Sequence, residues 1–183
     1  MSNSDNDIVK WYVMRAYKRE RKAVLALADE GVETFYPLHK VIVEKGGTKK
    51  LVEKPLITSY IFVRSSRKVL LELKKIYPFL QFVMVNMDGL SREMTIPDSS
   101  MDDFICLVRS EYPRLKFYYY GEETYARILK GTRVRVIEGA FAGHEARVLS
   151  VKGSRNREVA VVIDGLVAAT VQMRAESLQI LNK

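Results

Sequence analysis

The segment that decides the fold of the C-terminal part of this chain spans residues 129–152 and reads LKGTRVRVIEGAFAGHEARVLSVK. Val134 and Val136 alternate with arginines, and a period of two places the valines on one face of a strand and the arginines on the other. The stretch GAFAG, residues 139–143, then offers two glycines that can adopt positive φ on either side of one large apolar side chain. The segment therefore predicts two strands with a basic outer surface, joined by a tight turn anchored in a small core.

Further short strands are expected around this segment. The dipeptide Asp164-Gly165 is typical of a tight turn between two of them. The expected strands cover residues 132–137, 145–151, 159–163, 167–171 and 178–181. Five short strands within residues 127–183 predict a small five-stranded β-barrel.

The N-terminal part alternates strands with helices. Residues 8–17, IVKWYVMRAY, are rich in β-branched and aromatic types and predict a buried strand. A helix over residues 18–30 should follow, with Gly31 well placed to end it. The other expected elements are strands at 33–43 and 51–63 joined by a hairpin tip, a helix at 69–76, a strand at 82–85 and a helix beginning near 98. This order predicts an α/β sandwich over residues 8–110, with helices packed on an antiparallel sheet, and an α+β fold for the chain.

The stretch between the two predicted domains has no clear periodicity. Residues 111–126 contain Pro113, Gly121 and a run of four aromatic residues, FYYY. We interpret this stretch as an inter-domain connection, part of which packs on a domain. A platform for stacking single-stranded bases is the alternative, which the scarcity of interleaved basic residues disfavours.

Two patterns in the N-terminal part stand out as binding surfaces. In PLITSYIFVR, residues 55–64, Tyr60 and Phe62 share one face while Ile61 and Val63 share the other, so the strand is apolar on both sides. One face must be core, and the other is either covered by a helix or exposed for docking. The second pattern is a basic cluster at the start of the first predicted helix, where cations are unfavourable: Lys18, Arg19, Arg21 and Lys22. A phosphate backbone would use this cluster, although a solvated helix face explains it equally well.

Composition narrows the class of protein. The 183 residues carry a formal net charge of +8. Residues 127–183 hold 10 Lys and Arg against 5 Asp and Glu, or +5, which favours a polyanion or an acidic protein as partner. The single cysteine, Cys106, excludes an internal disulfide and a four-cysteine zinc site. The polar N-terminus and the lack of a long apolar run predict a cytoplasmic protein with no membrane partner.

Catalytic patterns are missing from the sequence. His39 and His144 are the only histidines, lie in separate predicted domains, and have no cysteine or carboxylate at ligand or triad spacing. No glycine-rich phosphate loop precedes a helix. We therefore expect no enzyme activity, no metal and no cofactor, and we expect His144 to be a surface turn residue.

These patterns together resemble a family. The segment at 129–152 resembles the KOW motif, an SH3-like barrel module, with these residues at its key positions: Gly131, Val134, Val136, Gly139, Phe141 and Gly143. WYVMRAY and PLITSYIFVR resemble the first strand and the docking segment of NGN domains. The chain is thus similar to transcription elongation factors of the NusG type. Where that family has an aromatic residue followed by Pro-Gly or Pro-Asn, this chain has Ile57, Thr58 and Ser59, which argues against the housekeeping member. The long hairpin tip, the short linker-like stretch and the basic helix start are more reminiscent of specialised RfaH- and UpxY-type antiterminators.

The resemblance implies a function and partners. It implies binding to the clamp region of the largest RNA polymerase subunit, through Leu56, Tyr60 and Phe62, and processive transcription of selected long operons. It further implies that the basic cluster contacts the non-template DNA strand, and that the KOW domain contacts a ribosomal protein, a termination factor or nucleic acid. A housekeeping factor and a ribosome- or RNA-binding KOW protein without polymerase activity are the alternatives.

Overall fold

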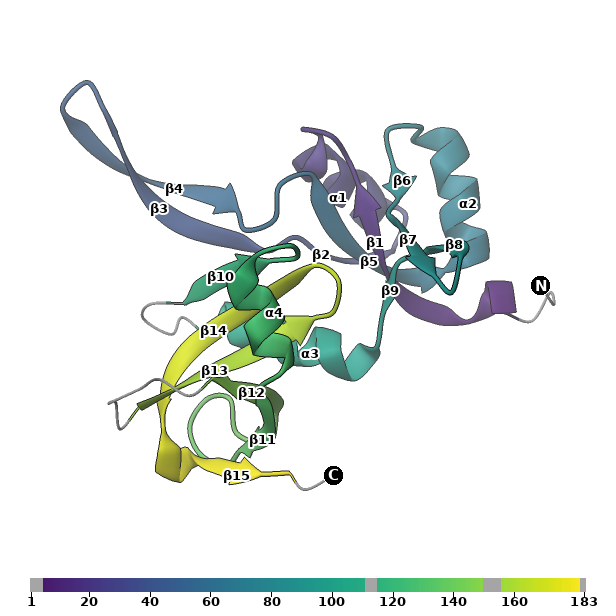
Figure 1. Ribbon diagram of the computed structural model, residues 1–183. Coiled ribbons are helices and arrows are strands. Elements are labelled where there is room, and N and C mark those ends of the chain that lie inside the picture. The colour runs from purple at the N-terminus through teal and green to yellow at the C-terminus, as the bar shows by residue number, and fades with distance from the viewer. Residues whose placement is uncertain (1–4, 111–114, 150–155, 182–183) are drawn as a thin grey trace. The chain divides into compact units, whose positions relative to one another are not determined.

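The computed structural model describes residues 5–110, 115–149 and 156–181 of the chain (Figure 1). Contacts divide the chain into two compact units, residues 1–97 and 98–183. The expected α+β fold is confirmed, because both units combine helices with antiparallel sheet. Within the described residues, no helix is both long and apolar enough to cross a membrane.

The first unit is built on an antiparallel sheet with the strand order β2-β5-β1-β6, in which β9 also pairs with β1. Its strands are β1 (Val9–Arg15), β2 (Glu33–Phe35), β5 (Tyr60–Ser66), β6 (Gln81–Phe82) and β9 (Thr95–Ile96). A short 3-10 turn, η1 (Asp5–Asp7), precedes β1. Strands β1 and β5 pair along seven residues, and this pairing forms the centre of the unit.

Two helices pack on the sheet of the first unit, α1 (Glu20–Asp29) and α2 (Arg67–Ile76). Their leucines Leu27 and Leu70 share one buried cluster with Ile61 and Val63 of β5. Helix α1 ends as predicted, because Gly31 at φ 69° donates its N–H to the Ala28 carbonyl. Helix α2 begins at a serine cap whose hydroxyl accepts the Val69 N–H at 3.4 Å.

Two hairpins extend from the first unit. The longer comprises β3 (Leu38–Lys45) and β4 (Thr48–Pro55), and the shorter comprises β7 (Met84–Met87) and β8 (Leu90–Glu93). Both turn on two residues with positive φ, namely Gly46-Gly47 and Asp88-Gly89. This geometry matches the type I′ turns that suit the twist of a hairpin.

The second unit contains a six-stranded sheet with the order β10-β14-β13-β12-β11-β15. Its elements are α3 (Asp98–Arg109), β10 (Lys116–Tyr119), α4 (Glu123–Leu129), β11 (Thr132–Val136), β12 (Glu145–Leu149), β13 (Asn156–Ile163), β14 (Val167–Arg174), η2 (Ala175–Ser177) and β15 (Leu178–Ile180). All five predicted strands are present, and β10 adds a sixth beside β14.

Several boundaries differ from the expectation. The first helix begins at Glu20, so Lys18 precedes it and Arg19 is its N-cap. The strand expected at 51–63 is broken at Leu56–Ser59, because Ser59 adopts φ 69° and cannot continue a strand. The stretch 111–126, read as a connection, contains β10 and the start of α4. The boundary between the two units, as their contacts define it, lies at Pro97, before the predicted boundary at residue 110. Helix α3 therefore belongs to the second unit. The limits of the functional domains stay a prediction.

Candidate polymerase and nucleic-acid interface

The pairing of β1 with β5 brings together two parts of the predicted binding surface. Arg15 stands directly opposite Tyr60, and its Nη2 donates a hydrogen bond to the Tyr60 hydroxyl at 2.8 Å. Its Nη1 donates to the Tyr17 hydroxyl at 3.3 Å. The guanidinium carbon lies 5.2 Å from the centre of the Tyr60 ring and 6.0 Å from that of the Tyr17 ring, within cation–π range. The hydrogen bond to Tyr60 raises the pKa of Arg15, which stays charged at physiological pH.

The backbone is strained on both strands beside this cluster. Tyr17 and Lys18 adopt φ 40° and 63° in the turn after β1, and Ser59 adopts φ 69° just before β5. Left-handed conformations are costly for residues with a side chain, and they often mark functional sites. The Ala16 N–H donates to the Ser59 carbonyl at 3.0 Å, which ties the two turns together. Tyr17 has 58% of its surface exposed.

The residues predicted for docking differ in their exposure. Tyr60 is partly exposed, as the docking hypothesis requires. Leu56 is only 5% exposed and Phe62 is fully buried, so the expectation that all three form an open surface is wrong for this structure. Phe62 lies opposite Phe35 of β2, and the two ring centres are 6.2 Å apart, so at least part of its burial comes from cross-strand packing.

The predicted basic cluster is exposed and lies next to aromatic rings. The side chains of Lys18, Arg19, Arg21 and Lys22 are all exposed. Arg19 and Lys22 both lie over the ring of Phe79, at 5.7 and 5.8 Å from its centre. Arg21 instead forms an ion pair with Glu53 at 3.8 Å.

Sequence reasoning missed Arg15, Tyr17 and Phe79. The spacing of Arg15 and Tyr17, two residues apart at the end of a predicted strand, was a usable signal. Phe79 lies in a loop 60 residues after Arg19, and no local pattern connects the two.

The residues of the KOW pattern are explained by packing and turn geometry. Val134, Val136 and Phe141 are at most 2% exposed and lie in the core of the second unit. Gly139 and Gly143 adopt φ 85° and 90° on either side of Phe141. A methyl group at Gly131 would lie 2.7 Å from the Val148 carbonyl oxygen, so only glycine fits there.

His144 is more than the surface turn residue that the sequence suggested. Its ring stacks on Phe141 with 4.6 Å between the ring centres, and its Nδ1 lies 2.6 Å from Oδ1 of Asp103 on α3. Burial raises the pKa of Asp103, and the hydrogen bond and charge of His144 oppose that rise. Among the described residues, no three His, Cys, Asp or Glu side chains are placed to hold a metal ion.

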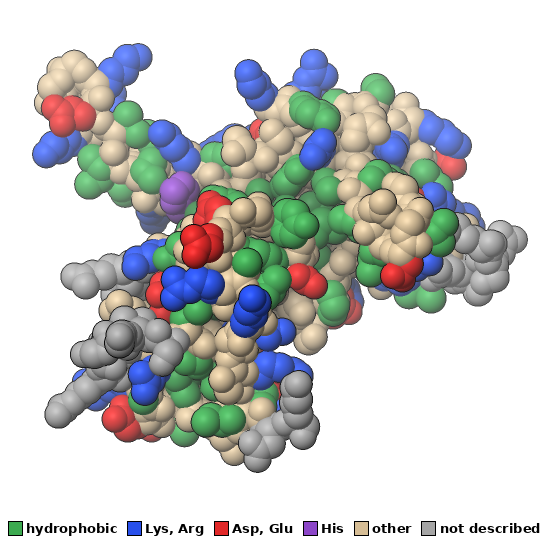
Figure 2. Space-filling model, in the orientation of Figure 1, with side chains coloured by type: hydrophobic (Ala, Val, Ile, Leu, Met, Phe, Trp, Pro, Cys, Tyr) green, Lys and Arg blue, Asp and Glu red, His purple; other side chains and the backbone are tan. Residues whose placement is uncertain are grey.

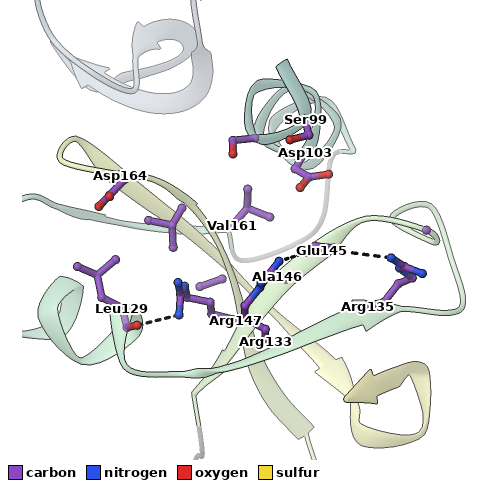
Figure 3. A pocket seen from close by; sticks show the side chains of 14 residues that line it. Ser99, Asp103, Leu129, Arg133, Arg135, Glu145, Ala146, Arg147, Val161 and Asp164 are labelled. Carbon is purple, nitrogen blue, oxygen red and sulfur yellow. Dashed lines mark hydrogen bonds and ion pairs between the residues drawn. The ribbon is translucent and has the colours of Figure 1, made fainter. Parts of the chain in front are cut away.

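The second unit also contains a cavity of about 520 Å³ between α3 and the β11–β12 strands (Figure 3). Arg133 and Arg135 both donate to the Glu145 carboxylate, at 2.6 and 3.2 Å, which lowers the pKa of Glu145. Arg147 donates to the Leu129 carbonyl at the end of α4, at 2.8 Å. These three arginines already have protein partners, and an equal number of carboxylates line the cavity, so it has no formal charge preference for an anion.

Comparison with known proteins agrees with the sequence patterns. The family model described as "Transcription termination factor nusG" matches residues 9–105, and the model described as "KOW motif" matches residues 130–164. A search of curated proteins gave no match. One similar solved structure is titled "Domain interaction in Thermotoga maritima NusG"; it has 18% sequence identity and a TM-score of 0.46, and the similarity covers 96% of this chain and 98% of that chain. Since the first family model spans more than half of the 183 residues, the chain belongs to the NusG family.

Proposed function

We propose that this chain is a transcription elongation or antitermination factor that binds RNA polymerase through its first unit and promotes processive transcription of selected long operons. Membership of the NusG family supports the role in transcription. The observation that carries the proposal is the 2.8 Å hydrogen bond between Arg15 and Tyr60. It joins the strand assigned to docking with the turn that leads into the basic cluster, so one continuous surface can contact protein and nucleic acid.

Tyr60 is the centre of the proposed protein contact, which is made with the clamp region of the largest polymerase subunit. Tyrosine suits this role because its ring adds apolar contact area and its hydroxyl keeps a polar partner. Leu56 and Phe62 are buried, so they contribute to the fold of this region and not to the exposed contact area. Truncating Phe62 to alanine removes about 3 to 5 kcal/mol of folding stability at a buried site, so that variant reports on folding as much as on binding.

The nucleic-acid contact uses the basic cluster Lys18, Arg19, Arg21 and Lys22 on the non-template DNA strand. Exposed cations bind phosphates without reading sequence, so the cluster positions the protein on the strand and does not select a gene. The ring of Phe79 packs partly against the core and lies beneath Arg19 and Lys22, so it helps to position these two cations. The KOW segment is assigned to a ribosomal protein or a termination factor.

A pull-down with purified core RNA polymerase tests the protein contact. The variant Tyr60→Ala should lose most polymerase binding while keeping the circular dichroism spectrum and unfolding midpoint of the wild type. Tyr120→Ala, at a tyrosine 70% exposed in the second unit, is the matched control and should bind normally. Normal binding by folded Tyr60→Ala would refute the docking assignment.

Recruitment to elongation complexes tests the DNA contact. Arg19→Glu/Lys22→Glu should weaken binding to complexes that contain DNA while leaving binding to free polymerase unchanged. Lys68→Glu/Lys75→Glu reverses two exposed charges on α2 and is the control. Equal losses with and without DNA would count against the assignment.

Genome-wide occupancy of the tagged protein tests the choice of operons. Occupancy of a few long operons is the expected result. A signal over all transcribed genes would identify a housekeeping factor instead.

A further inference from the structure

The hairpin of β3 and β4, hereafter the arm, extends from the first unit as a ribbon of two strands (Figure 1). Its strands pair with each other at eight positions and, within the described residues, with no other strand. At its base, the Leu56 N–H donates to the Pro37 carbonyl at 2.9 Å. A ribbon of two strands is marginally stable on its own, so a second layer packed on one of its faces would stabilise it.

One face of the arm repeats the same residue pattern on both strands. Residues directly opposite each other point to the same side of an antiparallel pair, and residues two apart along a strand share that side. The base row of this face, Leu38 opposite Pro55, is partly buried. The three outer rows define what is hereafter the patterned face: Lys40 opposite Glu53, Ile42 opposite Leu51, and Glu44 opposite Lys49. Each strand thus presents a lysine, a branched aliphatic residue and a glutamate, in chain order.

The centre of the patterned face is apolar and open to solvent. Ile42 and Leu51 keep 70% and 64% of their surface exposed, although they stand directly opposite each other. Figure 2 shows hydrophobic side chains beside basic and acidic ones on the arm, at the upper left. The contact between the two aliphatic side chains therefore leaves most of their surface available to a partner.

The charges around this centre are also available. Lys40, Glu44 and Lys49 are exposed and form no ion pair in the part of the chain that the structure describes. Glu53 lies 3.8 Å from Arg21 of α1, in an exposed ion pair of the kind that contributes little stability. All four charges of the patterned face can therefore contact a partner.

Stabilisation of the hairpin itself explains part of this pattern. Opposite charges that face each other across two strands favour pairing, and charges on exposed strands prevent association with the edges of other chains. Neither effect requires a large aliphatic pair that stays exposed at the centre of the charges. An apolar centre inside a charged rim is instead the usual arrangement of a protein–protein interface.

We propose that the patterned faces of two copies of this chain stack on each other and form an antiparallel dimer. Stacked sheets lie about 10 Å apart. A folded unit of about 100 residues is at least roughly 26 Å across, which is twice its radius of gyration. The two first units therefore fit only at opposite ends of the stacked arms, and this places the two-fold axis across the strands.

This axis brings unlike charges together at both ends of the interface. Each strand lies over the same strand of the second copy, with its direction reversed. Lys40 then faces Glu44 of the second copy, and Lys49 faces Glu53 of the second copy. The central rows meet each other, so four aliphatic side chains leave water together between four pairs of opposite charge.

The opposite face of the arm is not complementary to itself. It carries Lys45, Lys50 and Lys54 and no carboxylate. Stacking two such faces would bring six like charges together, which is unfavourable. The order of positive and negative charges along the strands therefore selects the patterned face for self-association.

The proposed interface is small, so the dimer should be weak. The patterned face contributes six side chains from each copy, whereas a standard interface contains about 20 to 30 residues a side. We expect a reversible dimer with a dissociation constant of about 0.1 mM. Its population then depends on the local concentration of the protein.

Sedimentation velocity of the full-length protein, free of nucleic acid, tests the proposal between about 10 μM and 1 mM. The wild type should shift with concentration from a monomer of 21.0 kDa towards a dimer. Lys40→Glu/Lys49→Glu makes the patterned face wholly acidic, and Glu44→Lys/Glu53→Lys makes it wholly basic. Each variant should weaken self-association at least roughly ten-fold. An equimolar mixture of the two variants should dimerise again, because an acidic face then meets a basic one.

The matched control places the same charge change on the opposite face of the arm. Lys45→Glu/Lys50→Glu should dimerise within about two-fold of the wild type, because these residues lie outside the interface. Circular dichroism and the unfolding midpoint establish that all three variants are folded.

Four results would overturn the proposal. They are a wild type that stays monomeric up to about 1 mM, an equal loss in the control, a dimer that survives in both charge-reversal variants, and a mixture of these variants that stays monomeric. If the wild type is monomeric and Lys40→Glu/Lys49→Glu loses polymerase in the pull-down, the patterned face binds the polymerase instead. Neither polymerase nor nucleic acid is present during sedimentation, so that result is independent of the proposed function.

Discussion

At the scale of single residues, Gly131 is constrained by its neighbours and not by its φ angle. An added methyl group would lie 2.7 Å from the Val148 carbonyl oxygen and 3.0 Å from that of Ile128, and backbone atoms cannot move aside cheaply. Gly131→Ala should therefore destabilise the second unit by about 1 to 3 kcal/mol in urea unfolding. Thr132→Ala changes the exposed neighbouring residue and should stay within about 0.5 kcal/mol.

Asp103 should give the stability of the chain a distinctive dependence on pH. The pKa of Asp103 is raised in the folded state, chiefly by burial. At a pH between the ordinary pKa of 3.8 and this raised pKa, the folded state therefore binds more protons than the unfolded state. Stability from this group is present below that window and falls as pH rises through it. Asp103→Asn removes the titration, so the wild type minus variant difference in unfolding free energy should fall across this acidic window. A flat or rising difference in chemical denaturation would contradict the assignment.

At the scale of elements, the hydroxyl of one tyrosine connects α4 to the turn between β13 and β14. The Tyr125 hydroxyl donates to the Ile163 carbonyl at 3.2 Å and accepts the Gly165 N–H at 2.8 Å, so it bridges both sides of the β13–β14 turn. Tyr125→Phe leaves both backbone groups without this partner and should cost about 1 to 3 kcal/mol in urea unfolding. Tyr120→Phe, at an exposed ring that contacts Tyr125 edge-on, should cost less than about 0.5 kcal/mol.

The same helix shows where sequence reasoning stops. Turns with strong local chemistry, such as Gly46-Gly47 and Asp164-Gly165, were predicted correctly because their residue types determine the backbone locally. Helix α4 has seven residues and no side-chain cap, so its sequence carries little helical signal. Its position depends on Tyr125 and Ile128 packing against Ala160 and Ala168, which are distant in sequence. Strand β10 was missed for the same reason, since its partner β14 lies about 50 residues further on.

The candidate site was predictable in part. Tyr60 was assigned from the resemblance to NGN domains, and the basic cluster from its charges at the start of a helix, so the two were predicted as unrelated sets. Arg15 connects Tyr60 with the basic cluster only because the register of β1 and β5 places Arg15 opposite Tyr60, which is 45 positions away in the sequence. The burial of Phe62 likewise follows in part from its pairing with Phe35 of a neighbouring strand. Alternation along one strand identifies two faces but cannot tell which of them is covered.

At the scale of the whole molecule, the two units should divide the proposed activities between them. Arg15, Tyr60 and the basic cluster all lie within residues 1–97, whereas the KOW segment lies within 98–183. We expect a fragment of residues 1–110 to bind core polymerase and a fragment of residues 98–183 not to bind it. Both fragments contain α3, so a difference between them cannot come from that helix. Size-exclusion chromatography and thermal unfolding establish that each fragment is folded before the pull-down. Polymerase binding by the second fragment alone would place the protein contact on the KOW segment, and the surface around Tyr60 would then need another partner.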